Sequence, residues 1–127
     1  MEYPDNLKYT KEHEWVIESE GMVIVGITDY AQDALGDVVF VELPEVGSEV
    51  KAGEPFGVVE SVKSVSDLYA PITGKVVEIN NGLEDEPELV NNSPFDEGWM
   101  IKIEVYDESE LDDLLSSSDY EEYVKSL

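Results

Sequence analysis

The fold is indicated most clearly by the stretch Gly57-Val58-Val59-Glu60-Ser61-Val62-Lys63-Ser64-Val65-Ser66-Asp67-Leu68-Tyr69-Ala70-Pro71, which is nearly symmetric about Lys63. Apolar, valine-rich runs flank a short polar centre, as in two antiparallel strands that meet at a tight turn. Pro71 ends the second strand, because proline has no backbone N–H to donate to a sheet. The stretch therefore predicts a β-hairpin that presents one lysine at its tip, between small side chains.

Other runs rich in valine and isoleucine predict further strands on both sides of this hairpin. They lie at residues 15–17, 22–28, 37–43, 46–54, 75–80 and 98–105. The order of strands and glycine turns before Lys63 loosely resembles the order after it. We therefore expect a mainly β fold, a flattened barrel or sandwich of two antiparallel sheets, with the lysine turn at one end.

A few short helices are expected beside the sheets. Residues 29–35 have the pattern of a helix in which Asp29 is the N-cap and Gly36 follows the last turn. Two C-terminal helices are indicated by apolar faces with i, i+3, i+4 spacing, first at Leu111, Leu114 and Leu115 and then at Tyr120, Tyr123 and Val124. We expect these C-terminal helices to cover an edge or face of a sheet.

The chain has 127 residues, which suits one domain with a substantial core. Between the last strands, Asn81-Gly82 predicts a tight turn, and residues 83–96 predict an acidic loop. We expect a single domain over residues 1–127, with its core at about 7–105 and a C-terminal helical extension at 106–127.

The composition is strongly acidic: 31 Asp and Glu residues stand against seven lysines and no arginine, for a net charge of −24 at pH 7. Such a chain repels nucleic acids and anionic membranes, which excludes both as partners. Three interpretations of the acidity stay open. It can be an ordinary solvated surface, a means of steering the chain toward basic patches on partner proteins, or an adaptation to high salt.

The chain contains no cysteine, which excludes disulfides, thiolate metal sites and a cysteine nucleophile. The segment Met1-Glu2-Tyr3-Pro4-Asp5 lacks the apolar core and basic residues of a signal peptide. No apolar run approaches the ~20 residues of a membrane span. We expect a monomer in the cytoplasm.

Catalytic signatures are missing. His13 is the single histidine, no serine lies in a Gly-x-Ser-x-Gly elbow, and there is no phosphate-binding glycine loop. A pair of histidines for a metal and the spacing of a calcium loop are also missing. A hydrolase with paired carboxylates stays open, although nothing singles out a pair. We predict a protein that is no enzyme and holds no metal, with His13 as a structural or partner-facing residue.

A lysine at a hairpin tip can instead be an attachment point for an acyl group. A thin, rigid turn fits an enzyme cleft, and small neighbours such as Ser61 and Ser64 leave the amine accessible. The alternative is an ordinary surface lysine. Against it, the flanks are symmetric and the turn centre lacks the glycine, asparagine or aspartate that most hairpin tips use.

The hairpin sequence resembles the lipoylation site of the H protein of the glycine cleavage system. Other segments that resemble this family, in the same order, are Tyr9-Thr10-Lys11-Glu12-His13-Glu14-Trp15-Val16, Gly26-Ile27-Thr28-Asp29-Tyr30-Ala31-Gln32, Gly36-Asp37-Val38-Val39-Phe40-Val41-Glu42-Leu43-Pro44, Ala70-Pro71-Ile72-Thr73-Gly74, Val90-Asn91 to Pro94, and Gly98-Trp99-Met100. Biotin carriers have a similar fold, but their acceptor lysine typically lies between methionines.

The resemblance implies a lipoyl-domain-like fold and lipoate in amide linkage on Lys63. The lipoyl arm would carry an aminomethyl group from a pyridoxal-phosphate glycine decarboxylase (the P protein) to a tetrahydrofolate-dependent aminomethyltransferase (the T protein). A flavin-dependent dihydrolipoyl dehydrogenase (the L protein) would then reoxidise the arm, and a lipoate-attaching enzyme would install it. The arm reaches about 15 Å from the Cα atom, enough to enter several active sites in turn.

The loaded arm ends in a protonated amine, so we expect it to dock against carboxylates that shelter a labile adduct from water. The resemblance points to Glu14 and Asp67 as the contacts of this amine, with Glu12 as a weaker candidate. Two alternative functions stay open: a lipoyl relay or donor for 2-oxoacid dehydrogenases, and an acidic scaffold that is not lipoylated.

Overall fold

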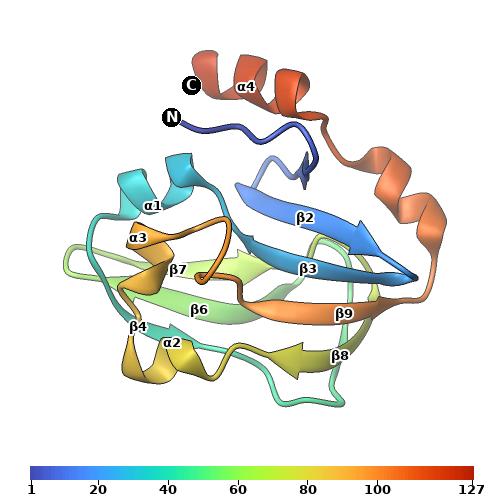
Figure 1. Ribbon diagram of the computed structural model, residues 1–127, viewed down its shortest axis with the longest axis horizontal. Helices are drawn as coiled ribbons and strands as arrows, with labels where there is room; N and C mark the ends of the chain where they lie inside the picture. Colours follow the sequence, from blue (N-terminus) through green and yellow to red (C-terminus); the bar gives the residue numbers. More distant parts are fainter.

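The structure, a computed structural model of residues 1–127, is a sandwich of two antiparallel sheets with short helices around it (Figure 1). The larger sheet has the strand order β1-β2-β3-β9-β8-β5, and the smaller has the order β4-β6-β7. The strands are β1 (Lys8–Tyr9), β2 (Glu14–Ser19), β3 (Met22–Ile27), β4 (Val38–Glu42), β5 (Glu49–Val50), β6 (Pro55–Ser61), β7 (Val65–Tyr69), β8 (Gly74–Ile79) and β9 (Ile101–Val105). The predicted sandwich is confirmed, and the sheets do not close into a barrel.

Alternating side chains of both sheets form the main core. Val23, Val25 and Ile27 of β3 alternate inward, and Val59 and Leu68 face them from the hairpin strands β6 and β7. β-Branched residues suit this position because they pack well on a pleated, half-buried surface. The core therefore lies between the sheets and holds the hairpin rigidly from its base.

Helix α1 (Asp29–Leu35) occupies the expected place, but its N-cap is not Asp29. The side chain of Thr28 accepts a hydrogen bond from the backbone N–H of Ala31, so Thr28 is the cap. Asp29 is the first helical residue and accepts a hydrogen bond from the Gln32 amide. Both residue types are good caps, and the buried position of Thr28 at the end of β3 decides between them. Gly36 ends the helix with a positive φ, as expected.

The region after β8 was predicted correctly in one respect and incorrectly in another. The expected tight turn is present, because the Leu83 N–H donates to the Asn80 carbonyl at 3.2 Å across Asn81-Gly82. This turn continues into the one-turn helix α2 (Gly82–Asp85), with Asn81 as its N-cap, where mainly a loop was expected. The segment expected to be a loop also contains a second one-turn helix, α3 (Leu89–Asn92). Helix α2 buries Leu83 and helix α3 buries Val90. This packing stabilises both one-turn helices, which are too short to be stable through helix propensity alone.

The C-terminal part folds over the N-terminal segment, as Figure 1 shows at its top. A 3₁₀ helix, η1 (Glu108–Asp113), precedes helix α4 (Ser117–Lys125), so the first of the two expected helices is tighter and shorter than predicted. Leu115 lies in a bridge to Tyr9 rather than on a helix face. Tyr120 of α4 is fully buried against Tyr9 in a second small core.

Gly57 is required by the close approach of β6 to its neighbour β4. A Cβ atom at this position would collide with the backbone carbonyl oxygen of Glu42, which cannot move without breaking the pairing of the strands. We expect Gly57→Ala to lower the free energy of unfolding by about 2 kcal/mol, as overpacking typically does. Chemical denaturation would measure this, with Gly82→Ala as control, because only a side-chain atom of Asn80 lies near that position. Equal stability of the two variants would contradict the expectation.

Candidate functional site

The tip of the β6–β7 hairpin is held by one serine hydroxyl. The Ser61 backbone N–H donates to the Ser64 carbonyl at 2.8 Å. The Ser61 Oγ accepts from the backbone N–H groups of Lys63 at 3.3 Å and Ser64 at 3.1 Å. Ser61 is buried although it is polar. The sequence suggested only that this residue is small, whereas a serine two residues before the tip is itself a turn signal.

Lys63 is exposed to solvent at this tip. It makes no hydrogen bond through its side chain, and the two salt bridges of the molecule involve Lys51 and Lys125 instead. Its methylene groups lie over Gly36, where a Cβ atom would stand 3.2 Å from the Lys63 Cε. Gly36 thus leaves room for the lysine stem, and the amine is free to be acylated. These features fit an amide-linked group on Lys63.

Exposed apolar side chains surround the lysine. Val62 and Val65 are 69% and 66% exposed, and Val39 and Phe40 on the adjacent strand β4 are each about half exposed, at 49% and 51%. The Val62 backbone N–H donates to the Asp37 carbonyl at 3.0 Å and so ties the tip to β4. We call Val39, Phe40, Val62 and Val65 the apolar collar. Exposed apolar side chains that lie together on an otherwise charged molecule are typical of a surface that another protein contacts.

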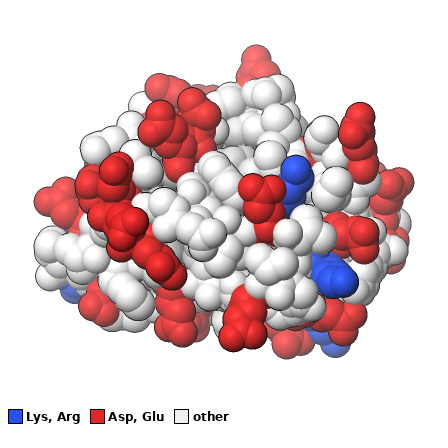
Figure 2. Space-filling view, turned by 60° about the horizontal axis from the view of Figure 1, so that its bottom comes forward, with Lys and Arg blue, Asp and Glu red and all other residues white.

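The rest of the surface is acidic. Figure 2 shows one face of the molecule, on which Asp and Glu side chains are widely spread and lysines are few. With a net charge of −24, the field of the molecule favours approach of basic surfaces and disfavours nucleic acids and anionic membranes.

A cleft of about 280 Å³ lies beside the hairpin, between α1, β7 and the turn before β2. Glu12, Glu14 and Asp67, the three carboxylates expected from the sequence, all line it, and we call it the acidic cleft. Lys63 is not among its lining residues, but its neighbour Ser64 is. The structure therefore brings the three carboxylates together next to the base of the lysine arm.

Glu14 is the unusual member, because its side chain is only 2% exposed. Its carboxylate accepts hydrogen bonds from the Thr10 hydroxyl at 2.6 Å and from the Tyr69 backbone N–H at 3.3 Å. Burial raises the pKa of Glu14 to about 8, although both hydrogen bonds act in the opposite direction. Near neutral pH, Glu14 can therefore change its charge at little cost when a cation enters.

The raised pKa predicts a pH-dependent stability. The folded chain binds the proton on Glu14 more tightly than the unfolded chain does. The resulting stabilisation is present below the unfolded pKa of about 4.3 and is lost as the pH rises through about 8. Glu14→Gln keeps a neutral group, so we expect the variant to gain about 2–4 kcal/mol over the wild type between pH 5 and pH 9.

Urea denaturation at the two pH values would measure this gain. Glu84→Gln removes the same formal charge from an exposed helix and corrects for the change in net charge. A Glu14→Gln advantage that is equal at pH 5 and pH 9 would contradict the assignment.

His13 also lines the acidic cleft, in a left-handed backbone conformation with φ of 71°. Its ring lies 4.7 Å from the Tyr30 ring, and Nδ1 is 2.9 Å from the Tyr120 hydroxyl. Burial lowers the pKa of His13, while Glu12 acts in the opposite direction. The sequence singled out His13 but gave no sign of its partner, which lies 107 residues further along the chain.

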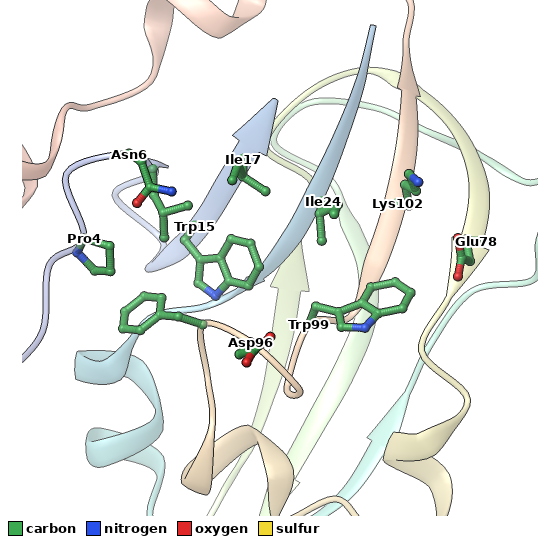
Figure 3. Close-up of a pocket in the computed structure, with 11 residues that line it drawn as sticks. Pro4, Asn6, Trp15, Ile17, Ile24, Glu78, Asp96, Trp99 and Lys102 are labelled. Atoms are coloured by element: carbon green, nitrogen blue, oxygen red, sulfur yellow. The ribbon is translucent and has the colours of Figure 1, made fainter. Parts of the chain in front are cut away.

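The largest hollow, about 570 Å³, lies elsewhere. Figure 3 shows Trp15, Trp99, Ile17 and Ile24 around it, on the outer face of the larger sheet. It shares no residue with the acidic cleft and contains none of the residues that the sequence singled out as site residues. No group of three or more His, Asp or Glu side chains could hold a metal ion, and none of the helices is long and apolar enough to cross a membrane.

Comparison with known proteins gives a consistent result. Residues 7–127 match the family described as Glycine cleavage H-protein. The chain is 60% identical to the glycine cleavage system H protein of Oceanobacillus iheyensis, over 98% of this chain and 99% of that one. It is 61% identical to the H protein of a Geobacillus strain, over 98% of each chain. The crystal structure of a glycine cleavage system H protein from Mycobacterium marinum superimposes with a TM-score of 0.82, at 42% identity and 97% coverage of both chains.

Proposed function

Because the chain belongs to the glycine cleavage H-protein family, we propose that Lys63 carries its lipoyl group in amide linkage. The chain is a lipoyl-carrying shuttle protein of the glycine cleavage system. Beyond this role, we propose the residue that carries the lipoyl group, the site where the arm docks and the individual partner proteins. The observation that carries it is the free, exposed amine of Lys63 at the tip of a rigid hairpin, one residue away from the acidic cleft.

The hairpin supports attachment in two ways. The hydrogen bonds of Ser61 hold the tip in one conformation, so an attaching enzyme has little backbone entropy to remove on binding. The apolar collar of Val39, Phe40, Val62 and Val65 offers apolar contact near an amine that is otherwise unpaired. When attached to Lys63, lipoate would supply a disulfide that can accept an aminomethyl group. The electron pair left when glycine loses carbon dioxide would form the carbon–sulfur bond, and the other sulfur of the broken S–S bond would take a proton.

The chain's own residues provide the place where a cationic amine can rest. We propose that Glu14 and Asp67 receive the amine in the acidic cleft, with a weaker contribution from Glu12. Burial of Glu14 means that an entering cation meets a carboxyl group with few competing waters, where the charge-assisted hydrogen bond is strong once the group is ionised. As the cation approaches, Glu14 releases its proton, since an adjacent positive charge favours the ionised form.

The partners are proteins of the glycine cleavage system. We propose that they are glycine decarboxylase, aminomethyltransferase and dihydrolipoyl dehydrogenase, with a lipoate-attaching enzyme before them. The acidic surface of this chain would favour encounters with partner surfaces that are basic. We further propose that the chain has no turnover of its own and acts as a mobile substrate. A monomeric, cytoplasmic protein forming one domain over residues 1–127 stays a prediction.

Reconstitution tests the proposed function. The lipoylated chain is mixed with glycine decarboxylase, aminomethyltransferase, glycine and tetrahydrofolate, together with dihydrolipoyl dehydrogenase and NAD⁺, which reoxidise the arm after each cycle. The production of methylene-tetrahydrofolate is then followed. We expect turnover that depends on this chain. A parallel reaction offers the same chain to a 2-oxoacid dehydrogenase that lacks lipoate. If lipoate is transferred to that dehydrogenase and no glycine-dependent turnover is seen, the chain acts as a lipoyl relay for 2-oxoacid dehydrogenases and not as an aminomethyl shuttle.

A further inference from the structure

One buried hydroxyl connects the C-terminal helix α4 to the acidic cleft. The Tyr120 side chain is fully buried, and its Oη atom lies 2.9 Å from the His13 Nδ1 and 2.7 Å from the Thr28 Oγ1. Thr28 is itself the N-cap of α1, which forms another wall of the cleft. The hydroxyl thus adds a side-chain connection between two walls of the cleft, beside the backbone hydrogen bond from the Thr28 N–H to the His13 carbonyl.

His13 needs such a support because its backbone is in the left-handed region, which residues with a side chain rarely adopt. Its N–H donates to the Thr10 carbonyl at 3.1 Å, and its carbonyl accepts from the Thr28 N–H at 3.0 Å. The ring is fixed by Tyr120 and by stacking near Tyr30. Glu14 is the next residue and begins β2, where it pairs with Ile27 of β3. Its carboxylate accepts from the Thr10 hydroxyl, so the turn from Thr10 to His13 helps to orient it.

We propose that Tyr120 is a positioning residue for the lipoyl arm: its hydroxyl holds His13 and Thr28 and thereby keeps Glu14 aimed into the acidic cleft. The hydroxyl can donate to one of these partners and accept from the other, so both are satisfied by a single side chain. The C-terminal helix is in this way part of the docking site, although it contributes no lining residue to the cleft. The inference rests on the proposed docking of the arm beside Glu14.

Tyr9 offers a matched control. It is fully buried like Tyr120, and the two rings stack at 4.7 Å with an interplanar angle of 7°. Its hydroxyl donates to the Pro4 carbonyl at 2.8 Å, away from the cleft. Tyr9→Phe and Tyr120→Phe therefore remove the same atom from the same stacked pair, and only the second breaks the connection to His13.

The first readout uses the chain without lipoate. In Tyr120→Phe we expect amide hydrogen exchange of Thr28, whose N–H donates to His13, to become about fivefold faster, as for loss of one net hydrogen bond. NMR signals of His13 and Glu14 should shift as well. Tyr9→Phe should leave both observations as in the wild type, while thermal unfolding reports how much stability each variant loses.

The second readout is the rate at which the loaded, lipoylated chain loses its aminomethyl group to water. We expect about fivefold faster loss in Tyr120→Phe and an unchanged rate in Tyr9→Phe. If the two variants behave alike in exchange and in lifetime, Tyr120 serves packing only and the inference is overturned. A wild-type chain that cannot be lipoylated or loaded would instead contradict the proposed function. The hydrogen-exchange measurement would still test whether the Tyr120 hydroxyl holds His13 and Thr28.

Discussion

Replacing Lys63 with arginine reduces glycine-dependent turnover in the reconstituted system to the level measured without this chain. Arginine keeps the positive charge and nearly the length of the side chain, but its guanidinium stays protonated and does not become acylated. Because Lys63 is exposed and has no ion-pair partner, the substitution removes no structural contact. The variant should therefore fold normally and fail only as a carrier.

The matched control is Lys75→Arg, which changes an exposed lysine on β8, outside the acidic cleft. We expect it to support turnover like the wild type. Circular dichroism and thermal unfolding would establish that both variants are folded. Turnover in Lys63→Arg equal to that of the control would contradict the assignment of the attachment residue.

The second large effect is expected in the acidic cleft. Glu14→Gln combined with Asp67→Asn should shorten the lifetime of the loaded arm by about tenfold or more, since a hydrogen bond to a charged group contributes about 1.5–3 kcal/mol. Both carboxylates line the same cleft, and the buried position of Glu14 makes its share the larger. Glu12, which is exposed, should matter less when it is replaced by glutamine.

Release of the aminomethyl group from loaded chains, followed by mass spectrometry, would measure this lifetime. Each single variant is compared with the double variant, because contacts to one cation are not additive. Glu84→Gln again controls for the change of surface charge. An unchanged lifetime in the double variant would mean that the loaded arm does not dock in the acidic cleft and stays free in solvent.

Local patterns predicted most of the fold. Valine-rich runs bounded by glycine and proline identified the strands, and the near symmetry about Lys63 identified the hairpin, because strand and turn preferences act within a few residues. The errors lie where tertiary packing decides. The acidic, proline-containing residues 83–96 favour a loop by themselves, but burial of Leu83 and Val90 stabilises one-turn helices there. Thr28 is the cap of α1 because β3 leaves it buried there.

The sequence predicted only part of the candidate site. The resemblance to the family pointed to Glu12, Glu14 and Asp67, which the fold brings to one cleft from segments more than fifty residues apart. Nothing in the local sequence indicated that Glu14 is buried, because its environment is created by Thr10 and the distant backbone of Tyr69.

The contact between His13 and Tyr120 was even harder to predict from the sequence than the burial of Glu14. The apolar spacing around Tyr120 placed it on a helix face, but it gave no partner for the hydroxyl. Such pairings depend on how the C-terminal helix crosses the N-terminal segment, which a single sequence does not encode locally.

The intact mass of the chain shows whether Lys63 carries the lipoyl group. The chain is incubated with a lipoate-attaching enzyme, ATP and lipoate, beside Lys63→Ala, and the modified peptide is then sequenced by mass spectrometry. We expect a gain of one lipoyl amide on Lys63 and no gain in the variant. A folded wild-type chain that gains no mass, or one that is modified equally in Lys63→Ala, would contradict it.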